Sequence, residues 1–197
     1  PLCGVACQNI IQEVLSENNL PDGISCLING DYTVGEFMTK DDRLPLISAT
    51  GSVRMGKIVG QTVAARLGKT ILELGGNNAI IVTPSADLKV VLAGAVFGAV
   101  GTCGQRCTST RRLIVHSSIY DKVKEQMTSA YKQLRIGNPL DENNHVGPLI
   151  DKDSVNTYLK AIEAIKQEGG KMLVDGGLLE GEDYASGCYI KPCIAEV

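Results

Sequence analysis

Apolar positions along the chain follow two alternating periods, and this alternation predicts an α/β fold. Steps of three and four residues, as in Leu2, Val5, Ala6 and Ile10, are typical of helices with one buried face. This pattern predicts helices over residues 2–17, 33–40, 51–67, 87–100, 119–134 and 151–168. Short apolar runs bounded by turn residues predict strands over residues 24–28, 44–48, 70–74, 78–82, 111–116, 171–174 and 189–191.

One predicted helix differs from the others in its pattern. Residues 87–100 are apolar almost all round, which predicts a helix that is deeply buried rather than covered on one side. No internal repeat or low-complexity tract interrupts the alternation of helices and strands.

Composition narrows the class of protein. With 197 residues and 44% hydrophobic positions the chain can bury a core, and a net charge of −3 argues against nucleic acid as a partner. The sequence contains no run of 18 apolar residues, so no membrane-spanning helix is expected. Its first residues lack the basic lead and unbroken apolar stretch of a signal peptide, so none is expected. Seven cysteines without pairwise spacing favour a reducing compartment, the cytoplasm or, in a eukaryote, the mitochondrial matrix.

Two further features set expectations. Neither histidine, His116 or His145, has partners at metal-binding spacing, so no metal site is predicted. The chain begins with proline rather than methionine, which predicts a piece of a longer protein.

The first candidate site is the predicted junction of strand and helix around Gly51 and Ser52. Unpaired N–H groups and the positive end of a helix dipole attract phosphate at such a junction, and Gly56 allows close approach to the sheet or to a ligand. Taken alone, the segment is better explained as an ordinary serine N-cap, because the glycine spacing is weak and lacks the Lys-Ser/Thr of a P-loop.

The second candidate is Glu73, at the end of an apolar strand and before Gly75 and Gly76. Ligands of α/β sheets bind beyond the carboxyl ends of strands, and a glutamate shielded from water there has a raised pKa and can act as a general base. Taken alone, Glu73 is better explained as a strand-end glutamate that faces solvent or caps the next turn.

The third candidate is Cys107, in a glycine-containing loop directly after Arg106. A thiolate is the nucleophilic form of cysteine, and a nearby cation or oriented N–H groups favour it. The backbone N–H of Cys107 would also lie close to an oxyanion formed on the attacked carbon. Alone, an inert buried cysteine remains the better explanation, and a redox pair with Cys103 lacks the usual C-x-x-C spacing.

The order and spacing of the three sites change this assessment. The chain has a Gly51-Ser52 helix start, then Glu73-Leu74-Gly75-Gly76, then Gly104-Gln105-Arg106-Cys107. This succession resembles the aldehyde dehydrogenase superfamily. The resemblance extends to Ile136-Gly137-Asn138-Pro139 and Gly147-Pro148-Leu149-Ile150. Asn77-Asn78-Ala79-Ile80-Ile81 and Cys107-Thr108 are most similar to the antiquitin branch, the α-aminoadipic semialdehyde dehydrogenases.

The resemblance implies an NAD-dependent aldehyde dehydrogenase. Cys107 would be the nucleophile, and Glu73 would activate the water that hydrolyses the thioester. Arg106 would anchor a substrate carboxylate. For the cofactor, the resemblance implies contacts with Gly51, Ser52, Gly56, Leu74 and Gly75. It also implies a small aldehyde as substrate and a homo-oligomer, either a dimer or a tetramer.

The implied architecture is an α/β fold in two parts. Residues 1–74 would be the second half of a Rossmann-type cofactor domain, and residues 75–197 an incomplete α/β catalytic domain. Ala49 replaces the usual phenylalanine of the family, and several family segments are missing, including those that contact the adenosine ribose. The choice between NAD and NADP therefore stays open, as do two other functions: a folded scaffold without activity, and a cysteine esterase that needs no NAD.

Overall fold

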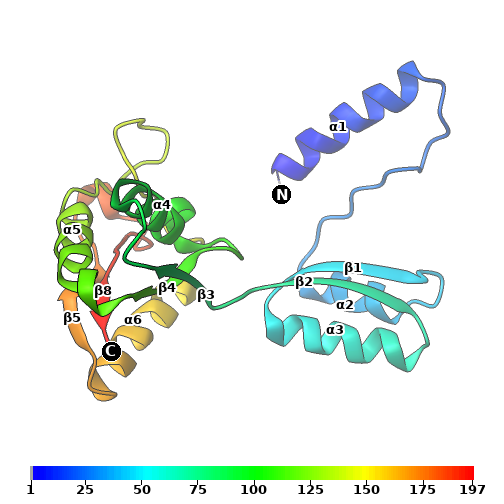
Figure 1. The fold of residues 1–197 in the computed structure, drawn as a ribbon. Helices are drawn as coiled ribbons and strands as arrows, with labels where there is room; N and C mark the ends of the chain where they lie inside the picture. Colours follow the sequence, from blue (N-terminus) through cyan, green and yellow to red (C-terminus); the bar gives the residue numbers. More distant parts are fainter. Residues whose placement is uncertain (1) are drawn as a thin grey trace. The chain divides into compact units, whose positions relative to one another are not determined.

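The computed structural model describes residues 2–197, and their contacts divide the chain into two compact units, Pro1–Leu74 and Gly75–Val197. The first unit contains helices and strands in the order α1 (Leu2–Glu17), α2 (Tyr32–Lys40), β1 (Leu46–Gly51), α3 (Val53–Ala65) and β2 (Lys69–Leu74). Strands β1 and β2 pair in parallel and α3 connects them, which makes a βαβ unit (Figure 1).

Helix α3 packs against the β1–β2 pair (Figure 1). Val59 and Val63 are buried, as their spacing predicts. One turn earlier the helix comes closest to the sheet at Gly56, where an added Cβ would lie 2.5 Å from both methyl carbons of Leu74. Gly60 faces Leu72 with an ordinary clearance of 3.6 Å. The helix therefore rests on β2 at the position that has no side chain.

This close approach predicts opposite effects for two alanine substitutions on one helix. We expect Gly56→Ala to lower the free energy of unfolding by about 1–3 kcal/mol, because the Leu74 side chain must move. Gly60→Ala is the matched control, because its Cβ would make only an ordinary van der Waals contact with Leu72. This substitution is expected to raise the free energy of unfolding by up to about 1 kcal/mol, the difference in helix propensity. Thermal or urea unfolding measures both. Equal effects of the two variants would contradict the tight contact at Gly56.

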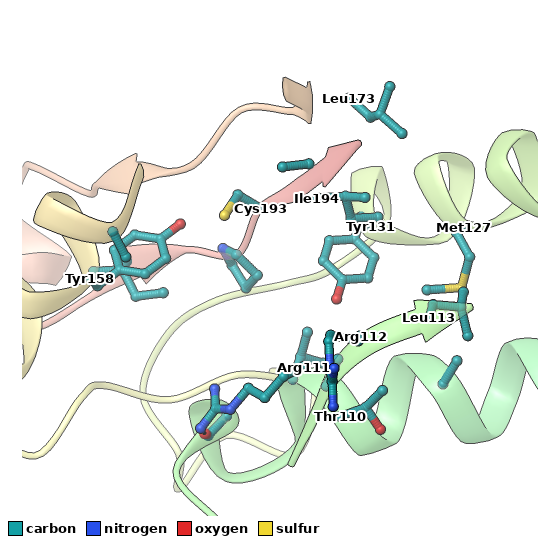
Figure 2. A pocket seen from close by; sticks show the side chains of 18 of the residues that line it. Thr110, Arg111, Arg112, Leu113, Met127, Tyr131, Tyr158, Leu173, Cys193 and Ile194 are labelled. Atoms are coloured by element: carbon teal, nitrogen blue, oxygen red, sulfur yellow. The ribbon is translucent and has the colours of Figure 1, made fainter. Parts of the chain in front are cut away.

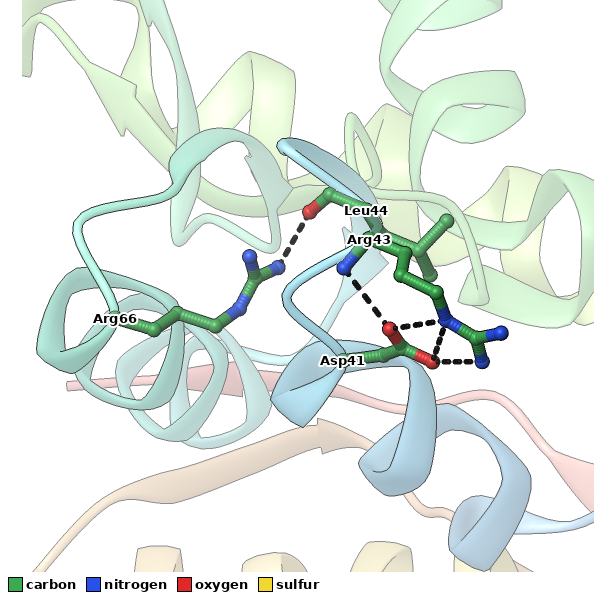
Figure 3. A network of polar contacts seen from close by, with 4 residues as sticks. All are labelled: Asp41, Arg43, Leu44 and Arg66. Carbon is green, nitrogen blue, oxygen red and sulfur yellow. Dashed lines mark hydrogen bonds and ion pairs between the residues drawn. The ribbon is translucent and has the colours of Figure 1, made fainter.

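A polar network fixes the loop between α2 and β1 (Figure 3). Arg66, the C-cap of α3, donates hydrogen bonds from Nε to the Thr39 carbonyl at 2.8 Å and from a terminal nitrogen to the Leu44 carbonyl at 2.6 Å. Asp41, the C-cap of α2, accepts from the backbone and guanidinium of Arg43. These bonds from Arg43 lower the pKa of Asp41 to about 2. The loop is thus held at both ends before β1 begins.

The strand predicted over residues 24–28 is wrong. This segment has no regular structure, and Ile24 and Ile28 are 60% and 63% exposed. The Ser25 carbonyl accepts hydrogen bonds from Gln8 and Gln12 of α1, and no neighbouring strand in the described part of the chain pairs with the segment. Apolar residues with high strand propensity form a strand only where a second strand supplies backbone partners.

The second unit begins with another βαβ unit, β3 (Asn78–Val82), α4 (Leu88–Val100) and β4 (Thr110–Val115), whose strands are parallel. Helices α5 (Tyr120–Lys132) and α6 (Lys152–Gln167) follow. The C-terminal part contains the antiparallel pairs β5 (Lys171–Val174) with β8 (Ile194–Glu196) and β6 (Gly177–Leu178) with β7 (Ile190–Lys191). The second unit also contains three short 3-10 helices: Gly101–Gly104, Ser117–Ile119 and Glu182–Tyr184. Strands β6 and β8 were not predicted, because they are too short to show a period.

The main core of the second unit lies between α4, α5 and the strands beside them. Its buried members are Ala95, Val100, Val123, Met127, Tyr131, Val146 and Val174. The prediction that α4 is buried all round is wrong, because only Ala95 and Val100 of this helix are buried, whereas Val90 and Phe97 are 69% and 66% exposed. The described contacts of α4 with other helices and strands are mainly with α5 and β4, so part of its apolar surface stays exposed.

A second polar cluster ties α5 to the last strand. Lys124 donates to both carboxylate oxygens of Glu196, at 2.8 and 2.9 Å, and the Tyr120 hydroxyl donates to the same group at 2.5 Å. The hydrogen bonds from Lys124 and then Tyr120 hold the pKa of Glu196 below its ordinary value of 4.5. The charged form of Glu196 is therefore favoured in the folded state.

The lowered pKa predicts how stability depends on pH. A carboxyl group whose pKa is depressed by folding stabilises the protein above its unfolded pKa, and this contribution is lost as the pH falls through the folded pKa. We expect Glu196→Gln to lower the free energy of unfolding at neutral pH and to match the parent protein at strongly acidic pH. Denaturant unfolding over a pH series measures the difference. Glu163→Gln, on α6, is the control: it has no ion-pair partner among residues 2–197, so a similar pH-dependent difference there would contradict the assignment.

None of the helices described in residues 2–197 is both long enough and apolar enough to span a bilayer. The same residues contain no cluster of His, Cys, Asp and Glu side chains that would hold a metal ion.

Candidate active site

In the first unit, the carboxyl ends of β1 and β2 bring two of the predicted sites to one edge. The parallel register places Gly51 beside Leu74 and Thr50 beside Glu73. Helix α3 begins directly after β1, so its N-terminus lies at the edge where the two strands end. Ligands of parallel α/β sheets bind at such an edge.

Ser52 is the N-cap of α3, as predicted. Its backbone is extended, and its Oγ accepts a hydrogen bond from the Met55 N–H at 3.1 Å. The N–H groups of Val53 and Arg54 donate no hydrogen bond within the described part of the chain. Ser52, Val53 and Arg54 are all exposed. Unpaired N–H groups at the positive end of a helix dipole are the arrangement that attracts an anion.

The other predicted residues of this unit lie around the same helix. Gly56 faces Leu74 of β2, so the contact that the structure shows for it is the packing of helix on sheet. Leu72 and Leu74 point toward α3, and Glu73 therefore points to the opposite face of the strand, where it is exposed. The carboxylate of Glu73 is thus accessible at the carboxyl end of β2.

In the second unit, Cys107 lies in the loop that connects α4 to β4. The loop leaves α4 through a left-handed turn, because Thr102, Cys103 and Gly104 all have positive φ angles, of 53°, 54° and 69°. A β-branched residue such as Thr102 seldom adopts this conformation, and strained backbone of this kind concentrates at functional sites.

A tight turn holds the backbone on both sides of Cys107. The Ser109 N–H donates to the Arg106 carbonyl at 3.1 Å, and the Arg106 N–H donates to Ser109 Oγ at 3.1 Å. Ser109 is fully buried, whereas Cys107 at the tip of the turn is exposed. The Cys107 N–H donates no hydrogen bond to any residue in 2–197. The turn therefore presents a free thiol and a free N–H group side by side.

The Arg106 side chain is directed toward α4. Its guanidinium carbon lies 4.6 Å from the centre of the Phe97 ring, and a terminal nitrogen donates to the Phe97 carbonyl at 2.7 Å. The buried Nε has no partner within the described chain. This attachment, which combines cation–π stacking with a hydrogen bond, fixes Arg106 next to the C-terminal end of α4.

Cys103 and Cys107 lie in different environments. Cys103 packs against both core clusters, and burial raises its pKa to about 11, so it is a neutral thiol at physiological pH. Cys107 is exposed. These differences make Cys107 the accessible thiol of this loop.

A large hollow of about 1080 Å³ lies elsewhere in the second unit (Figure 2). Consecutive residues of β4, from Thr110 to Val115, and of the C-terminal segment, from Pro192 to Val197, line it. Strand β4 pairs only with β3, and β8 only with β5, so the hollow runs along strand edges that have no partner in the described chain. Cys107 does not line this hollow, which is therefore not the candidate active site.

One polar residue beside Cys107 was not singled out from the sequence for any role. The side-chain amide of Asn78 donates to the Cys107 carbonyl at 2.7 Å and to the Ser109 carbonyl at 3.1 Å. Its signal in the sequence is an asparagine that opens an otherwise apolar strand two residues after a pair of glycines. The contact itself spans 29 residues and becomes visible only in the fold.

Comparison with known proteins identifies the class to which this chain belongs. The model of the aldehyde dehydrogenase family matches residues 1–197, and the chain is a member of that family. Among curated relatives it is 49% identical over 197 residues to aldehyde dehydrogenase family 7 member B4 of Arabidopsis thaliana, covering 100% of this chain and 38% of the relative. It is 46% identical over 193 residues to α-aminoadipic semialdehyde dehydrogenase of Bos taurus, covering 98% of this chain and 35% of the relative. The predicted resemblance to this branch of the family is confirmed.

Solved structures confirm the α/β fold. Glyceraldehyde-3-phosphate dehydrogenase of Methanocaldococcus jannaschii, complexed with NADP, matches with a TM-score of 0.89 and 33% identity, covering 100% of this chain and 41% of that protein. Betaine aldehyde dehydrogenase of Staphylococcus aureus, in complex with NAD⁺, matches with a TM-score of 0.87 and 28% identity, covering 94% and 37%. The chain spans 38% of the length of the Arabidopsis relative and 35% of the length of the Bos taurus relative.

Proposed function

We propose that the chain belongs to an enzyme that oxidises a semialdehyde to a carboxylic acid with NAD, and that α-aminoadipic semialdehyde is the substrate. The observation that carries the proposal is Cys107, an exposed thiol at the tip of a braced turn with an unpaired N–H group beside it. The 46% identity to an α-aminoadipic semialdehyde dehydrogenase supports the choice of substrate.

In this proposal Cys107 is the nucleophile. The thiolate adds to the aldehyde carbon to form a thiohemiacetal, and the Cys107 N–H donates a hydrogen bond to the oxyanion. Bound NAD⁺ supplies the acceptor for the hydride that leaves the thiohemiacetal, and a thioester on Cys107 remains. Glu73 removes a proton from the water that attacks the thioester, which releases the carboxylic acid and the free thiol.

The residues at the start of α3 fit a dinucleotide phosphate. The N–H groups of Val53 and Arg54 have no partner within residues 2–197 and lie next to the Ser52 hydroxyl. In the proposal Gly51 and Ser52 hold the pyrophosphate, and the backbone of Leu74 and Gly75 lies near the nicotinamide. A contact between Gly56 and the cofactor stays a prediction, as does the contact of Arg106 with a substrate carboxylate.

The remaining assignments rest on the resemblance to the family. Residues 1–74 would belong to the cofactor domain and residues 75–197 to the catalytic domain. The proposal also includes a homo-oligomer, a dimer or a tetramer, in the cytoplasm or the mitochondrial matrix. Among the solved relatives one was complexed with NADP and another with NAD⁺, so the cofactor needs a direct test.

The test is a set of assays on the complete gene product. Formation of reduced cofactor is followed with α-aminoadipic semialdehyde and with unrelated aldehydes, using NAD⁺ or NADP⁺. Turnover with NAD⁺ that is fastest for the semialdehyde supports the proposal. Hydrolysis of esters without any cofactor-dependent oxidation would favour a cysteine esterase, and the absence of both activities would favour a folded scaffold.

A further inference from the structure

The turn that carries Cys107 is attached through Asn78 to β3, the first strand of the same βαβ unit. This residue begins β3, and its side-chain nitrogen donates to the Cys107 carbonyl at 2.7 Å and to the Ser109 carbonyl at 3.1 Å. Both hydrogens of one amide nitrogen are thus used on the two carbonyl groups that flank Thr108. One side chain therefore holds the backbone on the C-terminal side of the cysteine.

The pairing of β3 with β4 explains why a side chain takes this place. The register shifts between Asn78 and Ala79, which pair with Thr110 and Arg112, so Arg111 has no opposite residue. An extra residue of this kind is a β-bulge, which bends a strand and redirects side chains next to active sites. At this irregular end of the ladder, the Asn78 amide donates to carbonyls of the loop that leads into β4.

Peptide geometry transmits these bonds to Cys107. In a trans peptide the carbonyl and the N–H group point in opposite directions. The Arg106 carbonyl accepts from Ser109 inside the turn, so the Cys107 N–H points out of it. The Cys107 carbonyl is held by Asn78, which fixes the next peptide plane. With both flanking planes held, the backbone sets the direction of the Cys107 Cα–Cβ bond and of its N–H group.

We infer that Asn78 is a positioning residue that holds the Cys107 thiol and its N–H group in the orientation needed for attack on the aldehyde. The inference rests on the proposed function, because it concerns the same nucleophile. Asn78 acts through the Cys107 carbonyl and touches no reacting atom. A misplacement of about 1 Å at a nucleophile can cost up to about 100-fold in rate, so two hydrogen bonds at this position have a measurable effect on catalysis.

The test compares adjacent asparagines in the complete gene product. Asn78→Asp keeps the shape of the side chain but removes the donor, and Asn78→Ala removes the side chain. Asn77→Asp and Asn77→Ala are the matched controls, because the Asn77 side chain makes no hydrogen bond within the described residues, whereas its carbonyl accepts from Arg112. The rate of the first hydride transfer and the KM for aldehyde are measured by rapid mixing.

We expect both Asn78 variants to lower the rate of hydride transfer by about tenfold or more, with KM changed less than about twofold, because position rather than binding is lost. The Asn77 variants should stay within about twofold of the parent protein. Asn78→Ser keeps one hydroxyl donor and should lie between the parent protein and Asn78→Ala. This graded order remains measurable if Asn78→Ala does not fold.

Three results would overturn the inference. They are unchanged hydride transfer in the Asn78 variants, a loss confined to KM, and an equal loss in the Asn77 variants. Failure of the proposed function is recognised separately, because Cys107→Ala would then keep its aldehyde dehydrogenase activity. An inactive Cys107→Ala together with fully active Asn78 variants would reject the positioning role alone.

Discussion

Replacement of Cys107 by alanine is expected to abolish aldehyde oxidation, with a loss on the order of 10⁴-fold or more in kcat. Without the thiolate the thiohemiacetal cannot form, and this adduct is the species from which the hydride leaves readily. Formation of reduced cofactor measures the loss. The same substitution should also remove any esterase activity, because both reactions need attack by the same sulfur.

The control for this result is Cys3→Ala, which removes an exposed thiol from α1 and should leave the rates unchanged. Alkylation with iodoacetamide gives an independent check. In the parent protein at neutral pH, the label should reach Cys107 well before Cys103, whose pKa is raised to about 11 by burial. A Cys107→Ala variant that oxidises aldehyde as fast as Cys3→Ala would refute the assignment of the nucleophile.

Glu73→Gln is expected to separate the two halves of the reaction. The amide cannot take a proton from water, so the thioester forms but is not hydrolysed at the normal rate. We expect one rapid burst of reduced cofactor, of about one equivalent per active site, followed by steady turnover about 10²- to 10⁴-fold slower than in the parent protein. Rapid mixing measures the burst, and mass spectrometry of the Cys107 peptide detects the acyl group.

Glu13→Gln, an exposed glutamate of α1, serves as the control for the same chemical change and should turn over normally. Full steady turnover by Glu73→Gln would show that another group activates the water. Loss of the burst as well as of steady turnover would assign Glu73 to the step before the thioester, and the role of general base would then be wrong.

Local patterns in the sequence predicted most helices and several strands well. Helix α3 begins where Gly51-Ser52 indicated, because the capping serine and the periodic residues Val59 and Val63 act within a few turns of chain. Strand β3 occupies residues 78–82 as predicted, since its apolar run is bounded by turn residues. These features depend on neighbours in sequence, so the sequence contains them directly.

Burial and strand pairing could not be predicted in the same way. The pattern of residues 24–28 is that of a strand, but no strand of the described chain lies beside the segment, and its backbone groups form no ladder. Helix α4 has an apolar surface all round and yet exposes Phe97 at 66%. The polarity of a side chain determines which environment it favours. The neighbouring helices and strands determine which environment it has in the fold.

Some features of the candidate site could also be predicted from the sequence, and others only from the tertiary structure. Cys107, Glu73 and the Gly51-Ser52 junction could be singled out from the sequence alone, because each is a reactive or anion-binding group within three residues of a glycine. The free N–H of Cys107, the attachment of Arg106 to Phe97 and the bonds from Asn78 came only from the tertiary structure. They arise where a register shift in the β3–β4 pair and a left-handed turn after α4 meet, and both depend on how distant segments pack.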